Sequence, residues 1–355
     1  MFINGGITFT GGLTLTPALA ALGFTSPALM NGSTSAAYPY AVAVNSSGLF
    51  VAVLQAGGVW GYATSTNGIT WTTPALMPGS VVGAPNAITV NSSGLFVAVG
   101  NRSADSAPLY ATSTDGSTWS TPALMNGSTS YANMSAIAVN SSGLFVAVGS
   151  NSSSQSVYAT STNGSTWTTP ALMPGGIAFT PTSMAVNSSG LFVAVGFQNN
   201  GGGATPYPFT YASSSNGSTW TTPTVTTSYN ATKMVVAVNS SGLFVVAYTY
   251  SVAAFATSSN GTSWSAFTNI PGIRFTVAAI TCSTAGIFVI VGSTTTGTYP
   301  AFTSSLDGTT WNSAITMNNS TTYAALTGLA VNSSGRFAAI GDNAANQPVA
   351  AYGLY

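Results

Sequence analysis

Few residues in this chain could carry out acid–base chemistry. Most glycoside hydrolases place two carboxylates across the scissile bond, and the 355 residues contain only Asp105, Asp115, Asp307 and Asp342, with no Glu and no His. Asp115 and Asp307 lie in turn motifs that account for them without catalysis, and a pair could form only by chance folding. We therefore predict that the chain is not an enzyme and has no catalytic residues.

Metal binding and nucleophilic catalysis also lack their usual residues. The single cysteine, Cys282, takes the place that Val44, Val139 and Val186 hold in related repeats, which favours a small buried hydrophobic side chain. Without His or clustered carboxylates, neither zinc nor a hard cation has a set of ligands. We predict no metal site and no cofactor.

The charge balance limits the possible partners. Arg102, Lys233, Arg274 and Arg336 balance the four Asp residues, so the net charge is zero. So few basic residues cannot neutralise many phosphates, which argues against nucleic acid. Apolar runs such as LFVAV are far shorter than the roughly 20 residues that span a bilayer, so we expect no membrane insertion. Little electrostatic repulsion opposes self-association, and further copies of this chain are the first partner we expect.

Two short phrases alternate along the chain. The first reads NSSGLF or a close variant and begins at Asn45, Asn91, Asn140, Asn187, Asn239, Ser283 and Asn332. The second ends in tryptophan and begins at Ser65, Ser113, Ser161, Ser214, Ser258 and Ser305. A repeat of roughly 47 residues is typical of solenoids, propellers and arrays, so one closed ring is the first fold to consider.

Each repeat unit predicts four short strands. In the second unit, apolar stretches at 87–90, 95–99, 109–114 and 119–121 are separated by turn residues and a variable loop. NSSG predicts the hairpin between the first two strands. In the second phrase, an Asn or Asp side chain should cap the turn amides, the next Gly should take a left-handed conformation, and the Trp should cover the turn. These residues are Asn67, Asp115, Asn163, Asn216, Asn260 and Asp307, with Trp71, Trp119, Trp167, Trp220, Trp264 and Trp311.

The second phrase resembles a known motif. Ser113, Asp115, Gly116 and Trp119 are similar to the S-x-[DN]-x-G-x-x-W pattern of the Asp-box, or BNR, repeat of sialidase-like β-propellers. The resemblance covers about residues 22–355 and implies blades of four antiparallel strands around a central axis. It also suggests sialidase activity, but that chemistry uses an arginine cluster and a Glu-supported Tyr nucleophile, and this chain has no Glu. A weaker resemblance is to repeat proteins of environmental bacteria and phages.

The two ends of the chain complete each other. The last unit contains three strands and stops before its second phrase, whereas FTSPALM at 24–30 aligns with WSTPALM at 119–125. Phe24 thus stands where Trp119 stands, and we expect it to pair near Tyr352. The prediction is an all-β, seven-bladed propeller of residues 22–355, closed by three C-terminal strands and one N-terminal strand. The PALM runs should cross between blades and pack their Leu and Met there.

Residues 1–21 form an extension that the ring does not need. Ile7, Phe9, Leu13 and Leu15 alternate with polar residues, as in a strand with one buried face. Such a strand could add to a neighbouring subunit or lie on its own propeller. We therefore expect a non-catalytic structural subunit of an extracellular filament or virion fibre, assembled through these four residues. The alternative is an adhesin that binds a glycan or cell-surface receptor, and a sialidase-like glycosidase is the weakest option.

The loops between the second and third strands vary most, at 101–107, 151–155 and 198–207, and binding commonly resides in such loops. Seventeen N-x-[ST] triplets occur, many of them within the turns. Sites in loops are the better candidates for N-glycans in a compartment with the machinery. These are Asn31, Asn101, Asn126, Asn133, Asn151, Asn230, Asn318 and Asn319. The first residues do not resemble a secretory signal, and we expect an extracellular or virion-surface location.

Overall fold

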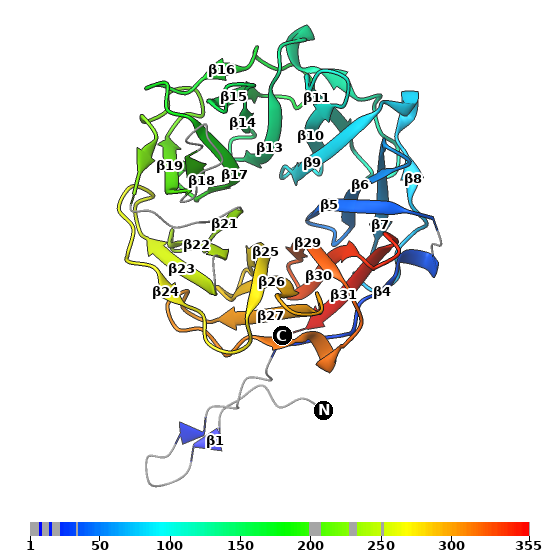
Figure 1. The fold of residues 1–355 in the computed structure, drawn as a ribbon, viewed down its shortest axis with the longest axis vertical. Helices are drawn as coiled ribbons and strands as arrows, with labels where there is room; N and C mark the ends of the chain where they lie inside the picture. The colour runs from blue at the N-terminus through cyan, green and yellow to red at the C-terminus, as the bar shows by residue number, and fades with distance from the viewer. Residues whose placement is uncertain are drawn as a thin grey trace.

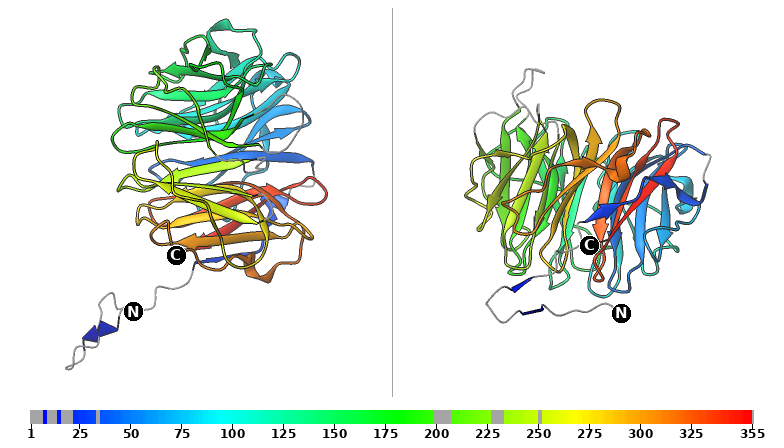
Figure 2. Two further views of the ribbon diagram at one scale, coloured as in Figure 1. Left: turned by 60° about the vertical axis from the view of Figure 1, so that its left-hand side comes forward. Right: turned by 90° about the horizontal axis from the view of Figure 1, so that it is seen from below.

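The computed structural model describes residues 7–8, 14–15, 22–32, 35–198, 207–226, 233–249 and 252–354. Seven antiparallel sheets are arranged around a central axis (Figure 1), and the side views show their strands running through the thickness of a disc (Figure 2). Each sheet has four strand positions, counted outward from the axis. The predicted all-β, seven-bladed propeller is confirmed.

The blades follow the order of the chain. Blade 1 is β5 (Ala37–Val44), β6 (Phe50–Ala56), β7 (Val59–Ser65) and β8 (Ala75–Leu76), and blade 2 is β9 (Gly83–Val90), β10 (Phe96–Arg102), β11 (Pro108–Ser113) and β12 (Ala123–Leu124). Blade 3 is β13 (Asn133–Val139), β14 (Phe145–Ser150), β15 (Ser156–Ser161) and β16 (Ala171–Leu172), and blade 4 is β17 (Phe179–Val186), β18 (Phe192–Gln198), β19 (Phe209–Ser214) and β20 (Thr224–Val225). Blade 5 is β21 (Met234–Val238), β22 (Phe244–Thr249), β23 (Ala253–Ser258) and β24 (Thr268–Asn269), and blade 6 is β25 (Phe275–Cys282), β26 (Phe288–Thr294), β27 (Pro300–Ser305) and β28 (Ile315–Thr316). Blade 7 is β29 (Ala325–Val331), β30 (Arg336–Asp342) and β31 (Pro348–Leu354), with β3 (Gly23–Phe24) and β4 (Ala28–Leu29) on its outer edge. Four 3-10 turns complete the described elements: η1 (Met30–Gly32), η2 (Pro78–Ser80), η3 (Met125–Gly127) and η4 (Met317–Asn319).

The second strand of each blade forms the core. In blade 1, Phe50, Val51, Ala52 and Val53 are all fully buried. Successive side chains of a strand point to opposite faces, so a continuous apolar run is stable only where both faces of the sheet are covered. Neighbouring blades supply that cover, because the apolar clusters join residues of consecutive blades. The LFVAV runs are therefore what packs one blade against the next.

The fourth strand lies further along the chain than the sequence predicts. Residues 119–121 were expected to form it in blade 2, but β12 begins at Ala123, inside the PALM run. The PALM runs are thus the outer strands and not connections between blades. The Leu and the Met of each run differ in burial. Met77 and Met173 are buried, whereas Leu76 and Leu172 are 50% and 54% exposed. The expectation that both pack between blades is wrong for these leucines, since neighbouring residues face opposite ways.

The ends of the chain close the ring as predicted. Phe24 is paired with Gly353, and Leu29 with Val349, in the same register that joins Leu124 to Leu109 in blade 2. The amide of Thr25 donates to the Tyr352 carbonyl at 2.8 Å, and the Tyr352 amide donates to the Thr25 hydroxyl at 3.0 Å. In blade 2, Ser120 and Thr112 make the same two bonds. The N-terminal segment therefore makes the same two hydrogen bonds that the residue after the tryptophan makes in blade 2.

The two short strands of the extension pair with each other. β1 (Ile7–Thr8) and β2 (Thr14–Leu15) are antiparallel, with Ile7 opposite Leu15, and among the described residues neither pairs with a blade. Phe9 and Leu13 lie outside the described residues, so their predicted role in assembly stays a prediction. All seven blades already have their outer strand, so the ring offers no empty strand position for an incoming segment.

Truncating Phe24 should weaken the ring at its closure. Its ring is 5% exposed and lies 5.0 Å from Phe302, centroid to centroid. Replacing a buried Phe with Ala removes apolar contacts and leaves a cavity, so Phe24→Ala should lower the free energy of unfolding by about 3–5 kcal/mol. Urea denaturation measures this. Phe24→Trp, which installs the residue of the other blades, is the control and should lose much less; a loss below about 1 kcal/mol in Phe24→Ala would contradict the burial.

Candidate functional site

Two of the four carboxylates are held inside turns. In blade 2, Asp115 Oδ1 accepts hydrogen bonds from the amides of Ser117 at 2.8 Å and Thr118 at 2.6 Å, and Oδ2 accepts one from the Thr118 hydroxyl at 2.8 Å. Gly116 follows with φ of +75°, where a side chain would be strained. Asp307 and the four Asn residues at this position accept the same amide bonds. The predicted turn role describes the geometry at all six positions.

These bonds stabilise the charged form of both carboxyls. The pKa of Asp115 is lowered, first by the bond from the Thr118 amide and then by that from Ser117. Burial acts to raise the pKa of Asp307, but the bonds from the Thr310 and Thr309 amides lower it further, and the net shift is downward. A carboxylate whose lone pairs are committed to turn amides at neutral pH is a poor general acid.

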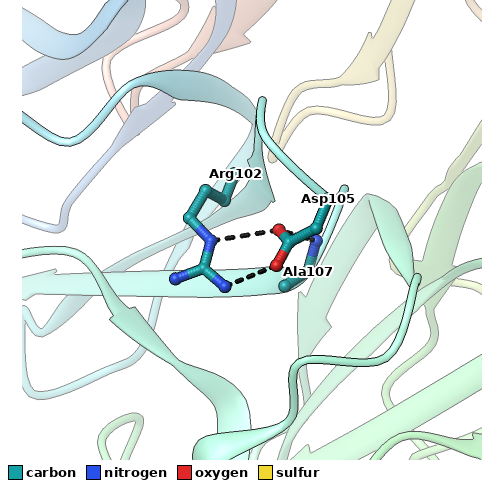
Figure 3. Close-up of polar contacts among 3 residues, drawn as sticks. All are labelled: Arg102, Asp105 and Ala107. Atoms are coloured by element: carbon teal, nitrogen blue, oxygen red, sulfur yellow. Dashed lines mark hydrogen bonds and ion pairs between the residues drawn. The ribbon is translucent and has the colours of Figure 1, made fainter.

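The other two carboxylates lie apart. Asp105 lies in the loop between β10 and β11 and pairs with Arg102, the last residue of β10 (Figure 3). Arg102 donates from Nε to Asp105 Oδ1 at 3.0 Å and from Nη2 to Oδ2, and the Ala107 amide also donates to Oδ1 at 3.0 Å. These bonds, that of Arg102 first, lower the pKa of Asp105 to about 2. Asp342 ends β30 in blade 7, where burial raises its pKa. The ion pair therefore shapes a loop, and no described carboxylate has a partner carboxylate for catalysis.

The remaining polar groups provide no reactive cluster. Burial raises the pKa of the half-buried Cys282 to about 12, so its thiol is a weak nucleophile. Desolvation of the ammonium group by the surrounding protein lowers the pKa of Lys233, although the residue is exposed at the central channel. Within the described ranges, no group of three His, Cys, Asp or Glu residues could hold a metal ion. Nor does that part of the chain contain a helix long and apolar enough to cross a membrane.

The tryptophans of the second phrase connect consecutive blades. An aromatic residue of the third strand packs on the tryptophan of the next blade, as Tyr62 does on Trp119 at 6.1 Å between centroids. The same contact joins Tyr110 to Trp167, Tyr158 to Trp220, Tyr211 to Trp264, Phe255 to Trp311, and Phe302 to Phe24. The indole N–H groups of Trp71, Trp119, Trp167 and Trp220 donate to the glycine carbonyl three residues earlier, at 3.0–3.2 Å. Those of Trp264 and Trp311 are buried without a partner.

A second set of contacts between blades was not predicted from the sequence. At every blade interface, an uncharged side chain bonds to the backbone of the next blade near the axis. These contacts are Gln55 to Gly83, Asn86 to Met134, Ser135 to Pro181, Thr182 to Met234, Thr249 to Phe275, Ser293 to Ala324 and Thr327 to Pro39. Several of these donors sit at a β-bulge, which interrupts six of the seven pairings between first and second strands. The donors are of four residue types, and some lie on first strands and others on second strands, so the repeat pattern carried no signal for them.

The channel on the axis is small. Its volume is about 180 Å³, and it is lined by first-strand residues of all seven blades, including Tyr40, Asn86, Thr182 and Lys233. Ligand sites commonly enclose about 300–1,000 Å³. Among the described residues of the lining, Lys233 is the only charged one.

The candidate glycosylation sites differ in accessibility. Asn31, Asn126, Asn318 and Asn319 are exposed, and the first three use their side-chain amides to contact Thr73, Thr169 and Ser26. Asn101, Asn133 and Asn151 are partly buried, and Asn230 lies outside the described residues. Asn319 is therefore the most accessible candidate, because it is exposed on the same turn as Asn318 and needs to break no hydrogen bond that holds a neighbouring blade.

The turn carboxylates predict a specific acid response. A carboxyl with a lowered folded pKa contributes stability above its unfolded pKa of about 4, and this is lost as pH falls toward the folded value. The raised pKa of Asp342 acts in the opposite direction and offsets part of the loss. The free energy of unfolding should thus be nearly flat between moderately acidic and neutral pH and fall below about pH 4.

Asp115→Asn combined with Asp307→Asn should flatten that fall, because Asn accepts the same bonds in the other four turns and does not titrate. Urea denaturation across the acid range is the measurement, and stability at pH 7 should be nearly unchanged. An acid response identical to that of the unaltered chain would show that the turns are not its source. Asp105→Asn measures separately the part of the fall that comes from the ion pair with Arg102, because the pKa of Asp105 is lowered as well.

Comparisons with known proteins show the fold. No protein-family profile and no curated protein sequence matches the chain. Among solved structures, the BP39L lectin from Burkholderia pseudomallei superposes with a TM-score of 0.70 at 12% identity, covering 89% of this chain and 95% of the lectin. A catalytically inactive virginiamycin B lyase from Staphylococcus aureus gives 0.68 at 10% identity, over 94% and 100%. The Hadza microbial sialidase Hz136 gives 0.52 at 14% identity, and this chain spans 65% of its length.

The spacing of the second phrase adds to this comparison. In all six copies Gly directly follows the Asn or Asp, as Gly116 follows Asp115, one residue fewer than in S-x-[DN]-x-G-x-x-W. The likeness to the Asp-box thus lies in the turn chemistry more than in strict spacing. The chain shares a β-propeller fold with this lectin, this lyase and this sialidase, and at these identities the likeness is one of fold alone.

Proposed function

We propose that this chain is a non-catalytic recognition propeller that binds a neutral glycan outside the cell or on a virion surface. The observation that carries the proposal is the placement of the four carboxylates. Two are committed to turns, one to an ion pair in a loop, and the last stands alone in blade 7. A rigid scaffold with hydroxyl- and amide-rich surfaces and almost no charge is suited to binding a neutral, hydroxyl-rich ligand.

The comparisons support recognition without deciding it. The lectin matches this chain over nearly the whole length of both, whereas this chain covers only 65% of the sialidase. The narrow channel on the axis and its lining argue against a sialidase-type centre. Binding at blade interfaces or loops therefore fits this chain better than chemistry on the axis.

Binding of the purified full chain to an array of neutral and acidic glycans tests the proposal. We expect retention on neutral glycans that is insensitive to salt, because no cluster of charges contributes. Incubation with the bound glycans should release no product, as judged by mass spectrometry of the supernatant. Hydrolysis would refute the non-catalytic assignment, and failure to bind any glycan would refute recognition.

A second candidate function is self-assembly through residues 1–21, as part of a filament or fibre. The observation that favours it is the extension itself: the ring closes without it, and β1 pairs only with β2 among the described residues. An incoming segment has no empty strand position to fill, so it would have to add to an outer edge strand such as β8 or β16, each two residues long.

Deleting residues 1–16 tests this assembly. We expect full-length chains to form multimers in sedimentation and negative-stain images, and the shortened chain to remain at its monomer mass. Ile7→Ser with Phe9→Ser should act like the deletion, whereas Thr8→Ser with Thr10→Ser, on the opposite face of the sequence pattern, should assemble normally. Assembly of the shortened chain, or a monomeric full chain, would refute this candidate.

A further inference from the structure

We infer that the aromatic hollow between blades 4 and 5 is a subsite for one pyranose ring of a neutral saccharide. This inference rests on the proposed function and names its site. We use "aromatic hollow" for the cavity lined by Phe209, Tyr211, Thr226, Trp264, Ser265, Ala266 and Phe267, which has a volume of about 370 Å³.

The walls of the hollow are aromatic rings set at steep angles. Phe209 meets Trp264 at 5.5 Å and Phe267 at 5.4 Å, centroid to centroid, with interplanar angles of 89° in both cases. Phe267 also packs edge-to-face against Tyr248, with 4.6 Å between the ring centroids and an interplanar angle of 84°. Phe209 and Tyr211 are buried and form the floor, whereas Trp264 and Phe267 are partly exposed. The hollow is thus preformed by edge-to-face packing, which limits the rearrangement that a ligand requires.

This interface departs from the repeat at the residues that build the hollow. Where Phe267 stands, three residues after the tryptophan, blades 1 to 4 have Pro74, Pro122, Pro170 and Pro223. Where Phe209 stands, two residues before the third-strand aromatic, blades 2 and 3 have Pro108 and Ser156. Both changes place large rings beside one interface. The interface of blades 1 and 2 has a large ring, Trp60, at the first position but Pro122 at the second, so the interface of blades 4 and 5 is the one with a large ring at both.

Trp264 differs from its counterparts as well. It is only partly buried, whereas Trp119 and Trp167 are 4% and 3% exposed. Its indole N–H does not make the bond to the glycine carbonyl that Trp119 and Trp167 make, and like that of Trp311 it is buried without a partner; Trp264 alone combines this with a partly exposed ring among the six tryptophans of the second phrase. A buried donor without an acceptor costs about 1–3 kcal/mol. Because this N–H is itself buried, a ligand hydroxyl in the hollow would reach it and remove that cost only after a small rotation of the indole.

The lining favours a sugar over other small ligands. Among the described residues no charged side chain lines the hollow, so an anion has no counter-charge there. The C–H groups on one face of a pyranose carry slight positive charge and pack on the negative face of an aromatic ring. Its hydroxyls can meet Ser265 and Thr226, whose hydroxyls donate to backbone carbonyls. Ser265 Oγ also accepts from the Thr257 amide at 3.0 Å, so Ser265 keeps one lone pair for a ligand. Flat apolar walls with a few polar groups at the rim are typical of such sites.

Titration of the full chain with methyl glycosides of glucose, galactose, mannose and N-acetylglucosamine tests the inference. The readouts are saturation-transfer NMR of the sugar and the indole N–H resonance of Trp264, which is identified by its loss in Trp264→Phe. We expect one glycoside to receive saturation at its ring protons and to shift that resonance. Phe267→Pro, which restores the residue of blades 1 to 4, should weaken binding about tenfold or more. Its melting temperature should stay close to that of the unaltered chain.

Trp264→Phe keeps a ring in the wall but removes the donor, and it should weaken binding several-fold. Trp167→Phe, the same change at the interface of blades 2 and 3, is the matched control and should leave binding unchanged. If a glycan binds but Phe267→Pro and Trp264→Phe bind as well as the unaltered chain, the hollow is not the site, although the proposed function stands. If no glycan binds at all, both fail. If a leucine-rich peptide shifts the Trp264 resonance and no glycoside does, the hollow takes a peptide and the inference is wrong.

Discussion

The antiparallel pairing of Phe24 and Leu29 with the last strand of the chain is the constraint on which the ring depends. Without it, β31 and the adjoining faces of blades 6 and 7 would be open to solvent, because each blade is covered only by its two neighbours. Phe24 also completes the series of aromatic contacts between blades, since it receives Phe302 where the other blades use tryptophan. One residue therefore closes both the sheet of blade 7 and the packing between blades.

Among the described residues, uncharged groups, and not ion pairs, make the polar side-chain contacts between the blades. Hydroxyl and amide side chains bond to backbone carbonyls across every blade interface, and Asn serves as well as Asp in the turns. Such bonds do not depend on salt and carry little desolvation cost beyond that of the backbone they satisfy. A ring stabilised in this way leaves its surface free of fixed charge, and recognition at that surface has to rely on shape, hydroxyls and aromatic faces.

The architecture could be predicted because the features that specify it are repeated. The counts of the two phrases, and the alignment of Phe24 with Trp119, were enough to predict seven blades and the ring closure. The position of the fourth strand was missed because Trp119 and the PALM run are both apolar, and only the register with β11 distinguishes them. The aromatic hollow was missed for the opposite reason: Phe209 and Phe267 break the pattern, and their meeting depends on packing between two blades. A search for departures from the repeat would have found Phe267 in place of proline.

The same closure that seals the ring also makes it mechanically uneven. The segment that carries β3 and β4 is held to blade 7 by two short antiparallel stretches, whereas every other outer strand directly follows the third strand of its own blade along the chain. Tension applied through residues 1–21 would act first on the pairing of Gly23 with Leu354 and would then break the hydrogen bonds of the segment one after another. Under such tension the contact of β3 and β4 with β31 is expected to break first, and the other blades would unfold only after it has broken.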